Sequence, residues 1–151
     1  MNRTWQCAVA TVSVLLATGC GAGGATTATP PGPIADQIAL GKAVYSSKCA
    51  GCHGLDGTGG DDTALIGDRA LPVEGSDVAG GPRQAGKPRT TKFLTASDVY
   101  VYTKTNMPDD GSPGSLKDSE YLALTAWMLN GNHVTMSAPL DSVNAASIRL
   151  H

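Results

Sequence analysis

The chain has 151 residues, of which 41% are hydrophobic and only 16% are charged, and it contains 19 glycines. This length suits one modest domain, and the composition favours a small fold rich in loops. The net charge of −2 argues against a nucleic-acid-binding protein, which needs a basic surface.

The N-terminus has the pattern of an export signal. Arg3 gives a short basic start, an apolar run extends from Trp5 to Thr18, and Gly19-Cys20 follows. The run is too short to cross a bilayer comfortably, so we predict a signal peptide over residues 1–19. Because Ala17-Thr18-Gly19-Cys20 resembles a bacterial lipobox, we expect Cys20 to be lipidated. That lipid would be the attachment to a membrane; a plain cleaved signal or an uncleaved anchor is the alternative.

The predicted mature chain begins with a flexible tether. Residues 20–35 are rich in Gly, Ala, Thr and Pro, a composition that cannot bury a core. We place the folded domain over residues 36–131 and an irregular C-terminal tail over residues 132–151.

The first predicted helix runs from Pro33 to Lys48, with Asp36 as its N-cap. One face of this helix carries Ile38, Gly41 and Tyr45 at helical spacing. Because a glycine costs a helix roughly 1 kcal/mol relative to alanine, we expect a second helix to approach closely at Gly41.

The motif Cys49-Ala50-Gly51-Cys52-His53 follows directly and is typical of a c-type haem attachment site. The thiols of Cys49 and Cys52 would form thioethers to one porphyrin, and His53 would supply the proximal nitrogen ligand of the iron. A zinc site or a redox dithiol uses the same pair of cysteines. However, Cys7 and Cys20 belong to the export segment, so zinc lacks further thiol ligands, and a dithiol motif would need a βαβ pattern. We therefore predict one covalently bound haem c with its iron.

The segment after the motif is predicted to be mostly loop. The glycine-rich residues 54–60 read as a solvated turn, and residues 65–89 are interrupted by Gly and Pro. We expect the second ring nitrogen of His53 to donate to a backbone carbonyl, with Pro72 as one candidate acceptor. Four basic residues form a local positive patch that would dock a redox partner, with an ordinary solvated loop as the alternative: Arg83, Lys87, Arg89 and Lys92.

Two more helices are predicted. One spans Thr95 to Asn106, begins with a capping box of Thr95 and Asp98, and ends before Met107-Pro108. The other spans Leu116 to Leu129 and ends at Gly131 as its C-cap. Lys117 is an unusual N-cap for this helix, and Ser115 with Asp118 could take its place. Its apolar stripe consists of Tyr121, Leu124, Thr125 and Met128.

The sixth ligand of the iron decides its chemistry. The candidates are Met107, Met128, Met136, His133 and His151. We predict Met107, because it lies on a loop between two helices, whereas Met128 reads as core and Met136 and His133 as surface. A different ligand or an open iron is the alternative. A thioether raises the reduction potential, and an iron with both axial positions filled is suited to one-electron transfer.

At this point the sequence resembles a class I monohaem cytochrome c. The matching pieces lie at residues 41–45 (GKAVY), 49–54 (CAGCHG), 106–108 (NMP) and 121–129 (YLALTAWML). The resemblance implies an all-α cytochrome c fold, with three main helices and long loops around one covalently bound haem. It also implies that Gly41 meets Trp127 where the first and last helices cross. The covalent cysteines, the proximal histidine and the distal methionine of the family correspond to Cys49, Cys52, His53 and Met107.

A narrower resemblance concerns the function. Gly86-Lys87-Pro88, Pro113-Gly114-Ser115-Leu116 and residues 120–126 look like cytochrome subunits of periplasmic sulfur-compound dehydrogenases, and in part like cytochromes that serve quinoprotein dehydrogenases. We therefore predict a periplasmic electron carrier, not an enzyme, that passes electrons from a dehydrogenase towards the respiratory chain. The alternatives are a dedicated cytochrome subunit of such a dehydrogenase, or a haem sensor or peroxidase-like protein with an open sixth position.

Overall fold

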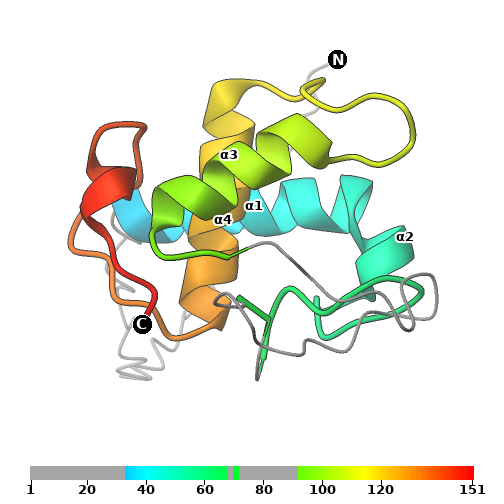
Figure 1. Ribbon diagram of the computed structural model, residues 1–151, viewed down its shortest axis with the longest axis horizontal. Coiled ribbons are helices and arrows are strands. Elements are labelled where there is room, and N and C mark those ends of the chain that lie inside the picture. The colour runs from blue at the N-terminus through cyan, green and yellow to red at the C-terminus, as the bar shows by residue number, and fades with distance from the viewer. Residues whose placement is uncertain (1–32, 68–69, 72–91) are drawn as a thin grey trace, which may run out of the picture.

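The computed structural model describes residues 33–67, 70–71 and 92–151, and they form an all-α fold (Figure 1). The elements are α1 (Pro33–Lys48), α2 (Ala50–His53), α3 (Ala96–Asn106), α4 (Asp118–Gly131) and the 3-10 helix η2 (Asn144–Ser147). In these ranges β pairing is limited to one isolated antiparallel bridge, between Thr95 and Arg149. The predicted architecture of three main helices with long loops is confirmed.

Helix α1 begins at Pro33, as predicted, because proline lacks the N–H that a first helical position would leave unpaired. Residues 33–35, predicted as the end of the tether, therefore form the first turn of α1 instead. The prediction of Asp36 as the N-cap is wrong, since Asp36 lies inside that first turn. Its carboxylate still faces the positive end of the helix dipole.

Helix α4 crosses α1 (Figure 1), and Gly41 is a point of close approach. A Cβ atom on Gly41 would overlap the Ala123 carbonyl oxygen and lie 2.9 Å from Trp127 Cβ. The expected meeting of Gly41 and Trp127 is therefore confirmed, with the Ala123 backbone as an even closer neighbour. Trp127 also stacks on Tyr45, with ring centroids 4.2 Å apart, and both rings are buried.

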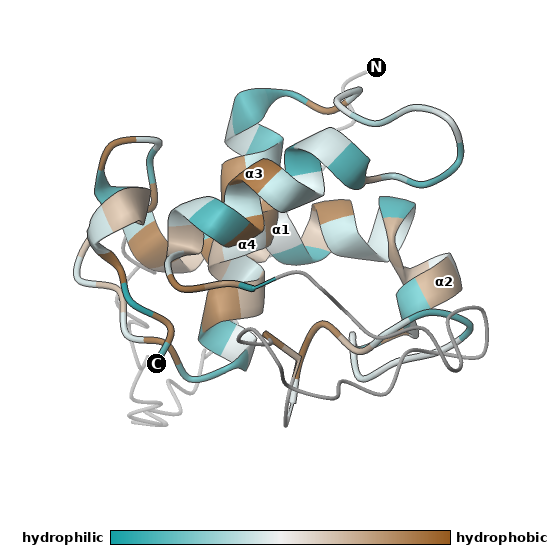
Figure 2. Cartoon of the chain, viewed as in Figure 1, coloured by the Kyte–Doolittle hydropathy of each residue, from teal (hydrophilic) through white to brown (hydrophobic). Residues whose placement is uncertain are grey.

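Helix α4 passes from a hydrophilic first turn to a hydrophobic middle (Figure 2). The four residues of its predicted apolar stripe are each at most 2% exposed, which confirms the stripe: Tyr121, Leu124, Thr125 and Met128. A face this completely covered by α1, α3 and the loops stabilises the fold mainly through burial.

The ends of α4 lie two residues later than predicted. Glu120 Oε2 accepts the backbone N–H of Lys117 at 2.8 Å, so the helix starts after Lys117, and Ser115 with Asp118 does not cap it. Gly131 is the last helical residue and not the C-cap. The Ile66 side chain packs so closely against Gly131 that a Cβ would not fit there, while the Asn132 side chain bonds the Met128 carbonyl at 2.8 Å.

The predicted capping box of α3 is confirmed. Asp98 Oδ2 accepts the backbone N–H groups of Leu94 and Thr95, each at 2.9 Å, and also the Thr95 hydroxyl at 3.1 Å. Burial alone would raise the pKa of Asp98, but these hydrogen bonds, with Arg149 nearby, hold it below its usual value.

The C-terminal tail is largely irregular, as predicted, yet it belongs to the core. Leu140 and Ala145 are buried. The Gln37 amide both donates to and accepts from the Leu140 backbone, at 2.7 Å each, and Leu150 N–H donates to the Leu94 carbonyl at 3.1 Å. The tail thus ties the starts of α1 and α3 together.

Candidate functional site

An open cleft lies between α2, α3 and α4 and encloses about 780 Å³, including its mouth. Most of its wall is apolar, with contributions from Leu65, Leu71, Phe93, Val99 and Leu124. Four of its lining residues are the predicted site residues Cys49, Cys52, His53 and Met107.

Helix α2 brings the motif residues to the cleft together. Cys52 N–H and His53 N–H both donate to the Cys49 carbonyl, at 3.1 and 3.0 Å, so the motif forms one helical turn. Residues at spacings of three and four lie on one face of a helix. The two sulfurs and the imidazole can therefore reach one planar ring from the same side.

Cys49 and Cys52 are not joined in a disulfide. Burial, and secondarily the neighbouring Cys52, raises the pKa of the Cys49 thiol to about 11. Redox-active CxxC motifs instead lower a thiol pKa so that the thiolate can attack. Within the described ranges no group of three or more His, Cys, Asp or Glu side chains could hold a metal ion. Neither the dithiol nor the zinc interpretation gains support from this part of the chain.

His53 is only 6% exposed, and a hydrogen bond to the backbone fixes the orientation of its imidazole ring. Its Nδ1–H donates to the Thr63 carbonyl at 2.7 Å. This bond uses Nδ1, so Nε2 is the ring nitrogen that can bind a metal. The acceptor is a backbone carbonyl, as predicted, but it belongs to Thr63 and not to Pro72, which lies outside the described residues.

The glycine-rich turn explains how Thr63 reaches His53. Gly54, Gly57 and Gly59 all have positive φ angles, of 85°, 84° and 111°, a conformation that glycine adopts without strain. These turns fold the chain back beneath α2 within ten residues. The prediction of a merely solvated turn is therefore wrong in part: Gly57 is buried, and a Cβ there would lie 2.9 Å from the Trp127 ring.

Tyr45 supports the same turn from α1. Its hydroxyl donates a short hydrogen bond to the Gly54 carbonyl. Burial, followed by the charges that Cys49 and Asp56 can carry, raises the pKa of Tyr45 to about 12. The hydroxyl thus remains a donor throughout the physiological range.

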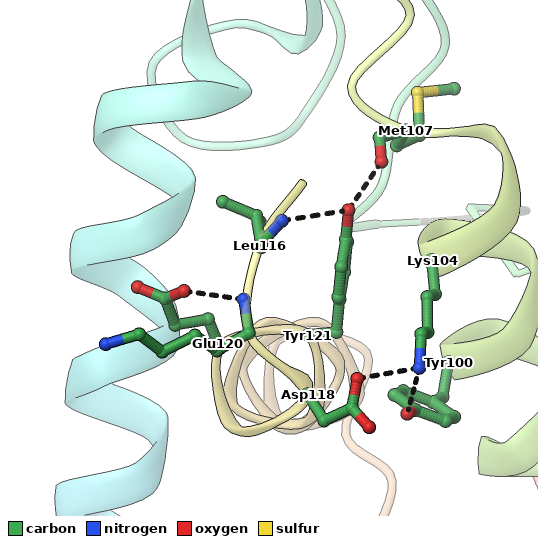
Figure 3. Close-up of polar contacts among 8 residues, drawn as sticks. Tyr100, Lys104, Met107, Leu116, Asp118, Glu120 and Tyr121 are labelled. Atoms are coloured by element: carbon green, nitrogen blue, oxygen red, sulfur yellow. Dashed lines mark hydrogen bonds and ion pairs between the residues drawn. The ribbon is translucent and has the colours of Figure 1, made fainter. Parts of the chain in front are cut away.

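Met107 reaches the cleft from the C-terminal end of α3. Its N–H donates to the Thr103 carbonyl at 2.9 Å, and its carbonyl accepts the Tyr121 hydroxyl at 2.9 Å (Figure 3). Pro108, Tyr102 and Thr103 line the cleft beside it. Sequence reasoning placed Tyr121 in an apolar stripe and missed this contact, which depends on how α3 and α4 are packed.

Of the other predicted candidates for the sixth ligand, Met128 and His133 lie where they were expected, whereas Met136, predicted to lie on the surface, is half-buried against the core. Met128 also lines the cleft, but it lies within α4 and is 2% exposed in the core. His133 and His151 are exposed, and Met136 lies with His133 in a separate pocket next to Ile34. Met107 is therefore the candidate that both lies on a loop and lines the cleft.

Several predicted features lie outside the described residues. These are the signal and lipobox residue Cys20, and Arg83, Lys87 and Arg89 of the basic patch. The fourth member of that patch, Lys92, is described and is exposed.

The fold and the cleft together define a c-type cytochrome. Two thiols, a buried imidazole with one ring nitrogen free, a thioether and an apolar wall are the donor set and surroundings that a covalent haem requires. Residues 36–128, more than half of the chain, match the family described as "Cytochrome C oxidase, cbb3-type, subunit III". The chain belongs to this family of c-type cytochrome domains. It is a class I monohaem cytochrome c with covalently bound haem c and its iron.

Two further comparisons complete the picture. No curated protein matches the chain. Among solved structures, a chain of the sulfane dehydrogenase SoxCD from Paracoccus pantotrophus is 25% identical, with a TM-score of 0.47. The match covers 74% of this chain and 52% of that one, so this chain spans about half the length of its counterpart.

Proposed function

We propose that this protein is a one-electron carrier whose haem iron is held by His53 and Met107. The observation that carries this proposal is that one cleft is lined both by the CxxCH turn and by the loop-borne thioether of Met107. Haem c supplies an Fe(III)/Fe(II) couple that takes up one electron and gives back one electron.

The residues of the chain have distinct tasks in this proposal. Cys49 and Cys52 would bind the porphyrin, and the Thr63 carbonyl, which accepts from His53 Nδ1, would orient the ring so that Nε2 can hold the iron. Met107 would supply the sixth ligand, which would leave no free site for oxygen or a substrate. A thioether ligand favours ferrous iron and raises the reduction potential. The apolar wall of the cleft excludes water around the couple.

The same proposal covers the partners and the location. The protein takes electrons from a periplasmic dehydrogenase and passes them to a respiratory acceptor, with the basic patch at Arg83, Lys87, Arg89 and Lys92 as its docking surface. The export signal and a lipid on Cys20 would hold it at a membrane. In the described part of the chain no helix is long and apolar enough to span a bilayer. A dedicated cytochrome subunit would copurify with its dehydrogenase, whereas a diffusing carrier would not.

Substitution of Met107 tests the ligation. In Met107→Ala the ferric protein should lose the weak long-wavelength absorption band of methionine-bound haem, and the ferrous protein should bind carbon monoxide readily. The reduction potential should fall by an appreciable part of the roughly 0.8 V over which axial ligands set haem potentials.

Met128→Leu is the matched control, because it conserves volume and Met128 also lines the cleft. It should keep the absorption band and exclude carbon monoxide. If Met128→Leu loses the band while Met107→Ala keeps it, the assignment of the ligand is wrong. A wild-type protein that is high-spin and binds carbon monoxide would point instead to a sensor or a peroxidase-like protein.

A further inference from the structure

Residues 107–116 form a loop that leaves α3 at Met107 and returns to the start of α4. Both ends of this methionine loop meet one side chain, Tyr121 (Figure 3). The Tyr121 hydroxyl donates to the Met107 carbonyl at 2.9 Å, and Leu116 N–H approaches the same hydroxyl at 3.5 Å. The Tyr121 side chain itself is fully buried in the core. A rigid residue of α4 thus contacts the loop where it begins and where it ends.

The rest of the methionine loop is held mainly by contacts within itself. The Asp110 carboxylate accepts the Ser112 N–H and hydroxyl, and Ser115 N–H donates to the Ser112 carbonyl. Gly111 and Gly114 have positive φ angles of 91° and 77°, which shape the turn. These bonds determine the form of the loop, but they do not attach it to the helices.

A second contact between α3 and α4 lies on the surface. Lys104 Nζ pairs with Asp118 at 2.7 Å, with side chains 38% and 66% exposed. An exposed pair of this kind contributes little to stability, because solvent screens the two charges. Among the described residues, the buried connection between the methionine loop and α4 is therefore the Tyr121 hydroxyl.

We infer that Tyr121 is a positioning residue that holds the Met107 thioether against the iron. The inference rests on the proposed ligation by Met107. The hydroxyl acts on the ligand's backbone carbonyl and not on its sulfur. Its loss should therefore change how readily Met107 leaves the iron, while the electronic character of the bound thioether stays the same. The wild-type absorption band should keep its position in Tyr121→Phe whenever Met107 is bound.

The test is ligand competition in the haem-loaded ferric protein. Imidazole can bind only after the native sixth ligand leaves, so its limiting binding rate at saturation reports the release of Met107. In Tyr121→Phe this rate should rise about 5- to 30-fold, the factor that corresponds to the loss of one buried hydrogen bond. The packing of the ring in the core is preserved.

Two controls separate positioning from general stability. Tyr100→Phe removes a hydroxyl whose contact is with Lys104 at 3.5 Å, so its rate should stay within about twofold of wild type. Asp98→Asn weakens the cap at the opposite end of α3 and lowers the melting temperature without touching the methionine loop. It should also leave the release rate unchanged. If Asp98→Asn and Tyr121→Phe accelerate release alike, the role of Tyr121 is merely structural and the inference is overturned.

The reduced protein gives a second measurement, should oxidised Tyr121→Phe prove too unstable. Ferrous iron holds a thioether more firmly, and carbon monoxide must displace the same ligand. Tyr121→Phe should bind carbon monoxide measurably faster than wild type, and Met107→Ala fastest. An unchanged rate in both states would reject the positioning role while leaving the ligation by Met107 intact. If wild type already matches Met107→Ala in both measurements, the proposed function fails instead.

Discussion

The two sides of the haem cleft are supported by different kinds of contact. On the His53 side the chain holds itself through its backbone: Gly59 N–H donates to the His53 carbonyl at 3.0 Å, Asp62 N–H to the Cys52 carbonyl at 2.9 Å, and His53 Nδ1–H to the Thr63 carbonyl at 2.7 Å. On the Met107 side the support from α4 is a single side-chain hydroxyl. The proposed proximal ligand His53 therefore lies in a turn held mainly by its own backbone. The proposed distal ligand Met107 bonds back to the Thr103 carbonyl through its N–H and is held from α4 by one side chain.

This difference has a consequence for mutation. Support by the backbone cannot be removed by trimming a side chain, but it can be disrupted where a side chain is added to a tightly packed glycine. Support by a hydroxyl is sensitive to the loss of one oxygen atom. With the proposed ligands, the distal side would release Met107 more easily, while the thioethers to Cys49 and Cys52 would keep the haem attached on the proximal side.

The largest effect is expected from adding a methyl group to the proximal turn, which is the glycine-rich segment over residues 54–63 that follows His53. In Gly54→Ala the new Cβ would overlap the Gly59 carbonyl oxygen, and φ at Gly54 is 85°. The free energy of unfolding should fall by roughly 2–6 kcal/mol, combining about 1–3 for a backbone conformation (φ 85°, ψ 159°) that is essentially restricted to glycine with about 1–3 for overpacking. Urea unfolding of the haem-loaded protein measures it.

Gly111→Ala on the methionine loop is the matched control. Its φ is 91°, but no atom lies within 4 Å of the new Cβ. It should therefore show only the backbone cost of about 1–2 kcal/mol. Equal losses in the two variants would mean that the proximal turn is no more tightly packed than the distal loop.

An intermediate effect is expected at Tyr45, whose hydroxyl bonds the Gly54 carbonyl on the proximal side. Tyr45→Phe should lower the free energy of unfolding by about 1 kcal/mol. It should leave the imidazole-binding rate unchanged, because the neighbouring backbone bonds still hold the turn. Tyr121→Phe should lose a similar amount of stability, because it also gives up one buried hydrogen bond, but it should in addition release its ligand faster.

The pKa of Tyr45 predicts how the difference in stability between wild type and Tyr45→Phe depends on pH. Folding raises the pKa of Tyr45 from 10.0 to about 12, so its contribution is complete below pH 10 and is lost as the pH rises towards 12. Wild type should lose stability over this interval relative to Tyr45→Phe. A difference between the two proteins that is constant from pH 8 to about 12 would contradict the burial of this hydroxyl.

The sequence predicts well what depends on side-chain type and local spacing. The CxxCH turn, the capping box at Thr95, the apolar stripe of α4 and the close approach at Gly41 all have signatures within one element. The methionine before Pro108 was likewise visible as a loop-borne thioether.

The contacts that support the ligands were not predictable in the same way. Any residue offers a backbone carbonyl, so nothing in the residue type marks Thr63 as the acceptor for His53. Tyr121 carries a visible hydroxyl, but its reach to Met107 depends on how α3 crosses α4, which no local pattern specifies. Two caps were also assigned to the wrong residue: α1 begins at Pro33, so Asp36 lies within its first turn, and Asn132, whose side chain donates to the Met128 carbonyl, follows Gly131 as the C-cap of α4.

The smallest effect is expected at Asp98, far from both ligands. Asp98→Asn keeps an acceptor oxygen but removes the negative charge at the N-terminus of α3, and should lower the free energy of unfolding by about 0.5 kcal/mol at neutral pH. Because the pKa of Asp98 is below its usual 3.8 in the folded protein, the carboxylate stabilises the fold above that pH, and this contribution is lost as the pH falls further. Wild type and Asp98→Asn should therefore converge in stability below about pH 4, as urea titrations at several pH values would show. A gap that widens in acid would mean that Asp98 is not the proton acceptor at this cap. Since the reduction potential depends on the cleft at the other end of α3, it should be the same in both proteins.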